Sequence, residues 1–225
     1  MQPYTKLLGV RDFLFWYCSD TAVKWYDPIK PYVKLEYEWV LDNVKLKGQN
    51  VMDVGSHYGH YSIILASQAE KLLCVEPDYP DIVVMNQNLK INNLTAEAYW
   101  GAVANKKGMR KYVLLGDGNG YLDANGQTEV ETSRLIDLMP NANVIKMDIE
   151  GAEFEVLPEQ VDEMSKCHTW IIEIHPHAGN PSVITKLFFE RGYELKKVSR
   201  EKNKVVDFVV GQSWQTPDTL IVRKV

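Results

Sequence analysis

The chain has 225 residues, of which 45% are hydrophobic and 24% are charged, a composition typical of one soluble globular domain. Its net charge of -5 argues against a large nucleic-acid-binding surface, because such surfaces are basic. No apolar run reaches the roughly 18 residues that span a bilayer, and the three cysteines form no C-x-x-C pair, which fits reduced thiols. We therefore expect a cytoplasmic protein with no membrane span.

The first predicted segment, residues 1–47, is rich in aromatic side chains and is interrupted by Pro28 and Pro31. Apolar residues recur at helical spacing between positions 33 and 44, which predicts a helix there. We expect an N-terminal helical extension that precedes a main domain of residues 48–225. Its aromatic side chains could cover a pocket as a lid, or they could pack in the core or against a second copy in a homodimer.

From residue 50 the chain alternates between short apolar runs and helical patterns. Strands are expected at residues 51–54, 71–75, 96–103, 143–148 and 169–174, and helices at residues 60–69, 80–91 and 181–191. This alternation predicts an α/β fold with a doubly wound, mostly parallel sheet. Two more strands are expected at residues 193–198 and 219–222, as an antiparallel pair at one edge, which makes a seven-stranded sheet.

Residues 110–131 interrupt this alternation. Glycines at positions 116, 118, 120 and 126 separate short β-like pieces at residues 111–115 and 128–131. We expect an insertion or a mobile loop here.

The most informative local pattern is the run VMDVGSHYG at residues 51–59, an apolar strand followed by a glycine-bearing turn. A second acid, Glu76, lies 23 residues after Asp53 and ends the next apolar run. A nucleotide-like ligand needs this layout, because glycines let the backbone approach the ligand and the second acid can hold both ribose hydroxyls.

The spacing of the glycines indicates which ligand this is. A dinucleotide fingerprint reads G-x-G-x-x-G, whereas Gly55 and Gly59 form G-x-x-x-G. His57 stands where the second glycine would be and would crowd a pyrophosphate, which disfavours an NAD-linked oxidoreductase. S-adenosylmethionine carries ribose and adenine without phosphates and fits better.

Acids or glycines also follow the later expected strands. They occur at residues 76–78, 101–104 and 148–151. Because ligands of open parallel sheets bind at the carboxyl ends of the strands, these strand ends together indicate one binding site.

With these motifs in place, the chain resembles the FkbM family of class I S-adenosylmethionine-dependent methyltransferases over roughly residues 35–195. The resemblance rests on DVGSHYGHYS at residues 53–62, Glu76-Pro77, NLKINNL at residues 88–94, AVANKKG at residues 102–108, TSRLIDL at residues 132–138, IKMDIEGAE at residues 145–153 and IEIHP at residues 172–176. The last two motifs are the specific ones. The family usually has Ala-Asn where this chain has Ser56-His57.

The resemblance implies the class I methyltransferase fold with S-adenosylmethionine as cofactor. The implied cofactor-binding residues are Asp53, Gly55, Ser56, His57, Gly59, Glu76, Pro77, Ala102, Val103 and Asp148. In this scheme Asp53 and Gly55 line the methionine end, and Glu76 holds the ribose, since a carboxylate accepts two hydrogen bonds at once. Ala102 and Val103 border adenine with Trp100 nearby, and Asp148 stands near the sulfonium and the acceptor.

Methyl transfer to a hydroxyl also needs a base near the acceptor oxygen. The candidates are Asp148, Glu150, Glu173 and His175, and we assign catalytic roles to Asp148, His175 and Glu173. A histidine has an ordinary pKa of about 6.5, which suits a base, although His175 could instead hydrogen-bond a loop carbonyl. Asp148, Glu173, His175 and His177 could also ligate a divalent metal. We do not favour a metal, because the spacing does not demand one.

The predicted function is methyl transfer from S-adenosylmethionine to a hydroxyl of a small molecule, such as a sugar, a glycan or a secondary metabolite. Methylation of a nitrogen or carbon atom is an alternative, and so is a non-catalytic S-adenosylmethionine-binding protein. The presence of Asp148 and His175 argues for an enzyme.

Overall fold

The computed structural model describes residues 2–115, 119–211, 214 and 217–224 of the chain. Its five parallel strands are β3 (Asn50–Val54), β4 (Lys71–Glu76), β5 (Glu97–Trp100), β10 (Val144–Met147) and β11 (Thr169–Ile174). The antiparallel strands β12 (Tyr193–Ser199), β13 (Lys204–Asp207) and β14 (Asp218–Lys224) extend this sheet. Together they form an eight-stranded sheet in the order β13-β12-β14-β11-β10-β3-β4-β5.

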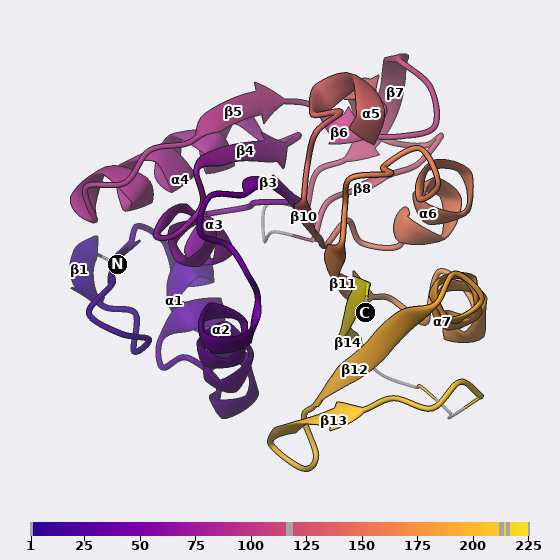
Figure 1. Cartoon of the computed structure of the whole chain (residues 1–225). Coiled ribbons are helices and arrows are strands. Elements are labelled where there is room, and N and C mark those ends of the chain that lie inside the picture. Colours follow the sequence, from indigo (N-terminus) through magenta and orange to yellow (C-terminus); the bar gives the residue numbers. More distant parts are fainter. Residues whose placement is uncertain (1, 116–118, 212–213, 215–216, 225) are drawn as a thin grey trace.

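Helices cover both faces of this sheet (Figure 1). On one side lie α1 (Asp20–Tyr26), α2 (Pro31–Asn43), α3 (His60–Ala66) and α4 (Tyr79–Ile91), and on the other α5 (Leu135–Leu138), α6 (Glu153–Gln160) and α7 (Pro181–Phe189). Successive strand residues point to opposite faces, so Val51 packs in one core and Met52 in the other. The predicted doubly wound α/β class is confirmed. No helix of the described residues is long and apolar enough to cross a bilayer.

The strand order reverses between β3 and β10, because the chain continues from β3 to β4 and β5 on one side and from β10 to β11 on the other. At this point the loops after the strands meet. The Asp148 N–H donates to the carbonyl of Val54 at 2.9 Å, and the Gly55 N–H donates to that of Val75 at 2.9 Å. Such a reversal leaves a crevice at the carboxyl ends of the strands, where ligands of open α/β sheets bind.

Three expectations for the sheet need correction. The sheet has eight strands instead of seven, because β13 pairs with β12 and forms the edge. The pair β12 and β14 is antiparallel as predicted, but it is not at the edge, since β14 lies between β11 and β12. The run 96–103 is two strands: β5 in this sheet and β6 (Ala102–Val103) in another, separated by Gly101.

The segment expected as an insertion or mobile loop forms a second sheet in its described part. Strands β7 (Gly108–Val113), β8 (Tyr121–Leu122) and β9 (Thr128–Ser133) join β6 in the order β6-β9-β7-β8. A glycine is needed at position 126, because a Cβ there would lie 2.5 Å from the backbone of Tyr112. The glycines at positions 116 and 118 lie outside the described residues.

The N-terminal extension contains the predicted helix, as α2, but it begins with a hairpin that was not predicted. Strands β1 (Tyr4–Leu7) and β2 (Leu14–Tyr17) pair antiparallel, and α1 and α2 follow. Asn88 of α4 and Asn92, which caps that helix, accept hydrogen bonds from the backbone of β2: Asn88 from Trp16 at 2.7 Å and Asn92 from Leu14 at 2.8 Å. Phe15 and Tyr17 are buried in the same core as the inner faces of α3 and α4.

Candidate active site

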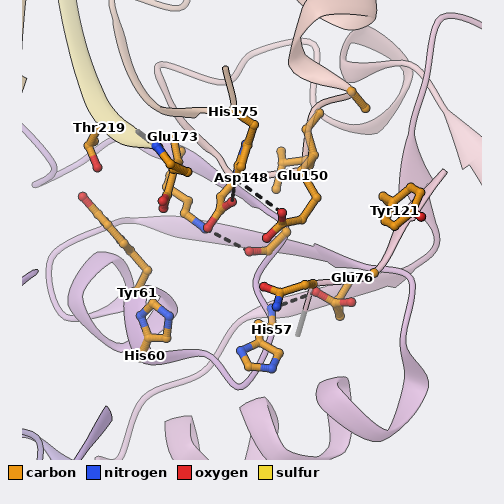
Figure 2. Close-up of a pocket in the computed structure, with 18 of the residues that line it drawn as sticks. His57, His60, Tyr61, Glu76, Tyr121, Asp148, Glu150, Glu173, His175 and Thr219 are labelled. Atoms are coloured by element: carbon orange, nitrogen blue, oxygen red, sulfur yellow. Dashed lines mark hydrogen bonds and ion pairs between the residues drawn. The ribbon is translucent and has the colours of Figure 1, made fainter. Parts of the chain in front are cut away.

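A cavity of about 370 Å³ opens at the carboxyl ends of β3, β4, β10 and β11 (Figure 2). The predicted site residues that line it are Gly55, His57, Glu76, Pro77, Ala102, Val103, Asp148, Glu173 and His175. The N-terminal extension contributes another part of the wall, through Trp25, Tyr26, Lys30, Tyr32, Val33, Glu36 and Tyr37. The second sheet closes one end with Tyr112 and Tyr121.

Three predicted binding residues do not line this cavity. Asp53 is fully buried, and its Oδ1 lies 3.4 Å from Nζ of Lys146. Ser56 is buried beneath the loop. Gly59 faces Met85 of α4, where a Cβ would lie 2.6 Å from the Met85 Cγ. The absence of a side chain at Gly59 therefore lets α3 and α4 pack closely, and it does not bring backbone to a ligand.

Gly55 also has an internal reason to be glycine. Its φ is 78°, and a Cβ would lie 1.7 Å from the carbonyl oxygen of Asp148. Lys146 stabilises the close approach of Gly55 to Asp148. Its Nζ donates to the Gly55 carbonyl at 2.9 Å and lies 3.7 Å from Oδ2 of Asp148. Burial opposes a charge on Lys146, but the carboxylates of Asp53 and Asp148 raise its pKa above the ordinary value. The sequence contained Lys146 as a motif residue without indicating this role.

Glu76 carries hydrogen bonds from its own chain on both carboxylate oxygens. Its Oε2 accepts from the His57 N–H at 2.8 Å, and its Oε1 accepts from the Asp78 N–H at 3.0 Å. Burial raises the pKa of Glu76 to about 7, against the effect of these two donors. Each oxygen can still accept a further hydrogen bond from a ligand. Trp100, expected near this end, is 60% exposed and does not line the cavity.

His57 connects the strand-end loop to the N-terminal extension. It has a φ of 46°, in the left-handed region that few residues other than glycine adopt. Its Nδ1 shares a hydrogen bond with the Tyr26 hydroxyl at 2.8 Å, and its Nε2 lies 3.5 Å from Oδ2 of Asp81. His57 is one of the two residues at which this chain departs from the family pattern. Its side chain joins α1 to the strand-end loop, and its backbone N–H donates to Glu76.

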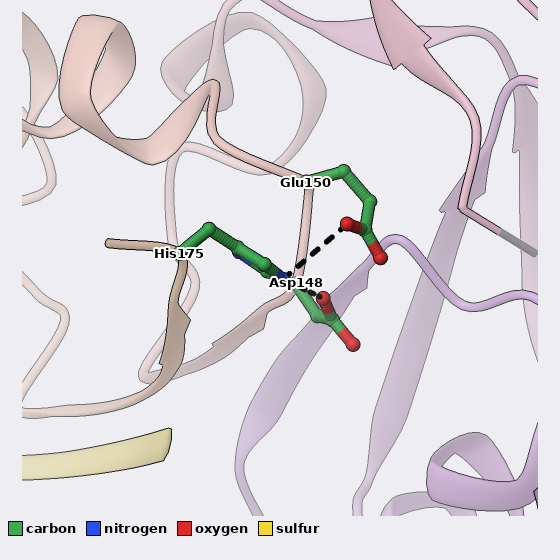
Figure 3. A group of neighbouring side chains, drawn as sticks. All are labelled: Asp148, Glu150 and His175. Atoms are coloured by element: carbon green, nitrogen blue, oxygen red, sulfur yellow. Dashed lines mark ion pairs between the residues drawn. The ribbon is translucent and has the colours of Figure 1, made fainter. Parts of the chain in front are cut away.

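Asp148, Glu150 and His175 form a cluster in the middle of the cavity (Figure 3). The His175 Nε2 lies 3.7 Å from Asp148 Oδ1 and 3.5 Å from Glu150 Oε2. Its Nδ1 lies 3.1 Å from Oε1 of the fully buried Glu153, which also accepts the His175 backbone N–H at 2.7 Å. Burial would lower the pKa of His175, but Glu153, Asp148 and Glu150 together raise it to about 9. The imidazole therefore carries a proton at neutral pH, which differs from the ordinary pKa expected from the sequence.

Glu150 has the features of a tuned carboxyl group. Its backbone is held at a φ of 52°, a conformation that costs energy for a residue with a side chain and that is frequent at functional sites. Burial and the Asp148 carboxylate raise the pKa of Glu150 to about 7, and His175 opposes the shift. Sequence reasoning included Glu150 among the base candidates but did not select it.

Glu173 lies towards the opposite end of the cavity from Glu76 (Figure 2). Its Oε1 accepts from an Arg200 guanidinium nitrogen at 3.1 Å, and burial followed by the charge of Asp148 raises its pKa to about 8. Glu36 and Thr219 also line the cavity, and the Thr219 hydroxyl donates to Glu36 Oε2 at 2.7 Å. Sequence motifs could not have identified these two residues, because they are 183 positions apart.

Of the four metal ligands considered from the sequence, the structure brings only Asp148 and His175 into one possible metal-binding group. Asp148, Glu150 and His175 present ligand atoms within 4.8 Å of one another. Glu173 and His177 do not belong to this group of described residues. Within this group His175 pairs with both carboxylates, at 3.7 Å and 3.5 Å.

The sequence is similar to known methyltransferases. Residues 53–195 match the family described as the methyltransferase FkbM domain. The hexuronic acid methyltransferase AglP of Haloferax volcanii is 26% identical over 171 residues, which cover 71% of this chain and 69% of that protein.

Solved methyltransferase structures share the fold. The methyltransferase FkbM from Methylobacillus flagellatus superposes with a TM-score of 0.57 at 14% identity, covering 86% of this chain and 48% of that one. This chain thus spans about half the length of that relative. An S-adenosylmethionine-dependent methyltransferase from Agrobacterium tumefaciens gives a TM-score of 0.58 at 11% identity, covering 100% of this chain and 70% of that one.

Proposed function

We propose that this chain, which belongs to the FkbM methyltransferase family, moves a methyl group from S-adenosylmethionine to a hydroxyl of a small molecule such as a sugar, a glycan or a secondary metabolite. Family membership makes the chain a methyltransferase. The donor and the acceptor atom are our inference. The observation that carries it is that Glu76 and the cluster of Asp148, Glu150 and His175 line one cavity.

The residues at the Glu76 end fit S-adenosylmethionine. Glu76 retains acceptor positions for a ribose diol, and the apolar side chains of Ala102 and Val103 suit the adenine ring. The carboxylate of Asp148 is suited to stand near a positive sulfur. When bound, S-adenosylmethionine supplies an activated methyl group on that sulfur.

In the proposed reaction the acidic cluster takes the proton that the acceptor hydroxyl loses as its oxygen is methylated. Glu150 suits this role at neutral pH, because a base works best when its pKa lies near the working pH. His175 is fixed by Glu153 and holds the carboxylates of Asp148 and Glu150 in place. The cluster titrates as a unit, so the proton belongs to the group rather than to one residue. Glu173 faces the acceptor.

The test has two parts. Calorimetric titration with S-adenosylmethionine and separately with NAD identifies the donor, and binding of NAD alone would contradict the proposal. Release of S-adenosylhomocysteine is then measured with panels of hydroxyl, amine and carbon acceptors. Turnover with a hydroxyl acceptor supports the proposal. Turnover with amines or carbon acceptors only would change the acceptor atom, and binding without turnover on any panel would favour a binding protein.

A further inference from the structure

The end of the cavity away from Glu76 carries polar side chains that the proposed proton transfer does not use. They are Glu36 of α2, Tyr61 of α3, Glu173 of β11 and Thr219 of β14. Figure 2 shows Tyr61, Glu173 and Thr219 together on one side of the cluster, with Glu76 and Tyr121 on the other. Glu36 and Thr219 lie outside residues 53–195, so the family match assigns them no role.

The carboxyl groups of Glu36 and Glu173 lie at this end of the cavity and have few hydrogen-bond donors near them. Glu36 is 7% exposed, and burial raises its pKa to about 7 although Thr219 donates to it. Glu173 accepts from Arg200 and has its pKa raised to about 8. A carboxylate has about four acceptor positions. Both groups can therefore accept more hydrogen bonds than the described residues give them.

The Tyr61 hydroxyl is the feature that points to a ligand. Tyr61 is 3% exposed, and its hydroxyl has no hydrogen bond of regular geometry within the described ranges. Burial raises its pKa well above 10, as do the charge of the adjacent Glu36 carboxyl and the hydroxyl's poorly aligned contact with that group, so the phenol keeps its proton. Buried polar groups nearly always have a partner. In Figure 2 the Tyr61 side chain reaches across the cavity towards Thr219.

We infer that Glu36, Tyr61, Glu173 and Thr219 form the acceptor subsite, and that this subsite binds a neutral sugar ring through its hydroxyls. The inference rests on the proposed methyl transfer. Neighbouring ring hydroxyls both donate and accept hydrogen bonds. They can donate to the two carboxyl groups and accept from the phenol, which are the bonds that this end of the cavity lacks.

The charges of the subsite disfavour an anionic ring. Above pH 8 the carboxyl groups of Glu36 and Glu173 are both ionised, and a uronate carboxylate placed against them would then be repelled strongly in this poorly solvated site. The described cations that line the cavity are already engaged. Lys146 and His175 pair with Asp148, Arg200 pairs with Glu173 at 3.1 Å and with Asp218 at 3.2 Å, and Lys30 lies over the Trp25 ring at 4.9 Å.

The experiment measures sugar binding to the protein loaded with S-adenosylhomocysteine, by titration followed with NMR. The probes are the methyl glycosides of glucose, galactose and mannose and, as the anionic counterpart, methyl glucuronide. At pH 9, above the raised pKa values of Glu36 and Glu173, we expect a neutral glycoside to bind and the glucuronide to bind at least about tenfold more weakly. Loss of one hydrogen bond should weaken glycoside binding about 3–10-fold in Tyr61→Phe, and Glu36→Gln should weaken it about tenfold.

Tyr4→Phe is the matched control, because it removes a tyrosine hydroxyl that lies outside the cavity and donates to Asp27 at an exposed position. Melting curves establish that each variant is folded, and Thr219→Val replaces Glu36→Gln if that variant is not. If S-adenosylhomocysteine does not bind the unaltered protein, the proposed function is wrong. If it binds but no neutral glycoside does, or the glucuronide binds as tightly, or the subsite variants match Tyr4→Phe, only the subsite inference is overturned.

Discussion

At one end of the cavity Glu76 already accepts two backbone N–H groups, whereas at the other end the Tyr61 hydroxyl has no regular partner among the described residues. The Glu76 end is therefore organised before any ligand arrives, because its carboxylate is held by the loops after β3 and β4. The Glu36 end brings buried carboxyl groups together with too few donors. Preorganised groups bind with a smaller entropic cost, so we expect the Glu76 end to bind its ligand alone and the Glu36 end to be completed by its ligand.

The cluster between the two ends should give the largest effect. Asp148→Asn, Glu150→Gln and His175→Ala should each lower turnover by about 10²–10⁴-fold, because the three groups take up the proton as one unit and a positioned base contributes that much. Affinity for S-adenosylhomocysteine should change less than turnover, since these groups act on the acceptor side. Steady-state kinetics and calorimetry on the same preparations measure the two quantities. Full turnover in all three variants would mean that the base lies elsewhere.

The same cluster makes the rate depend on pH. The proton acceptor must be ionised, and the raised pKa of Glu150 is about 7. Turnover at saturating substrate should therefore rise from pH 6 to pH 8 and level off above. Glu155→Gln on the exposed side of α6 is the control and should keep the profile. A flat profile over this range would argue against a carboxyl base with a raised pKa.

Removal of the proposed ribose contact should weaken cofactor binding at the Glu76 end of the cavity. Glu76→Ala should lower the affinity for S-adenosylhomocysteine by about 1.5–3 kcal/mol, the scale of hydrogen bonds to a charged group. The variant also frees the N–H groups of His57 and Asp78, so the loops lose their common acceptor. Calorimetry gives the affinity. Unchanged binding would remove Glu76 from the site.

The N-terminal extension should contribute less than Glu76 to the affinity for S-adenosylhomocysteine. Tyr26→Phe removes the hydroxyl that bonds His57 and keeps the buried ring. We expect about 2–10-fold weaker binding of S-adenosylhomocysteine, since one neutral hydrogen bond contributes about 0.5–1.5 kcal/mol. Tyr4→Phe, which removes a hydroxyl of the same extension outside the cavity, should bind normally. Equal effects in both variants would show that the bond to His57 does not matter.

The smallest effect concerns stability. Glu36 and Glu76 have pKa values raised to about 7, and Glu173 to about 8. A carboxyl group whose pKa is higher in the folded than in the unfolded chain favours folding below the unfolded value and loses that contribution as pH rises through the folded value. The melting temperature should thus fall between about pH 5 and pH 8 and level off above. Glu36→Gln should make this slope shallower, and an unchanged slope would assign the effect to other groups.

The strands nearest the site could be predicted from the sequence because each is a short apolar run that is buried on both faces. The expected strand at residues 169–174 is β11, and the run at residues 51–54 differs from β3 by one residue. The FkbM resemblance is likewise confirmed, since its motifs are local. The hairpin of β1 and β2 and the edge strand β13 were missed. β1 is exposed at every position and β13 shows no regular alternation, whereas the four residues of β2 are all hydrophobic, so its alternating burial leaves no pattern in the sequence.

The cofactor end of the site was easier to predict than the acceptor end for a physical reason. Glu76 follows a strand at a spacing set by one β-α-β unit, and a single motif reveals it. Glu36, Tyr61 and Thr219 come from α2, α3 and β14, and only the folded sheet brings them together. The pKa of His175 also could not be predicted from the sequence, because burial lowers it while Glu153, Asp148 and Glu150, brought close by the fold, raise it.

The hydrogen bond between Glu36 and Thr219 also determines when the site can form during synthesis on the ribosome. Its two residues are 183 positions apart, and β14, which carries Thr219, enters the sheet between β11 and β12. Ribosomes synthesise a chain at about 5–20 residues per second, and its amino-terminal part can begin to fold first. The residues of α2 are therefore made about 10–40 seconds before Thr219, and the acceptor end is assembled only after β14 has left the exit tunnel.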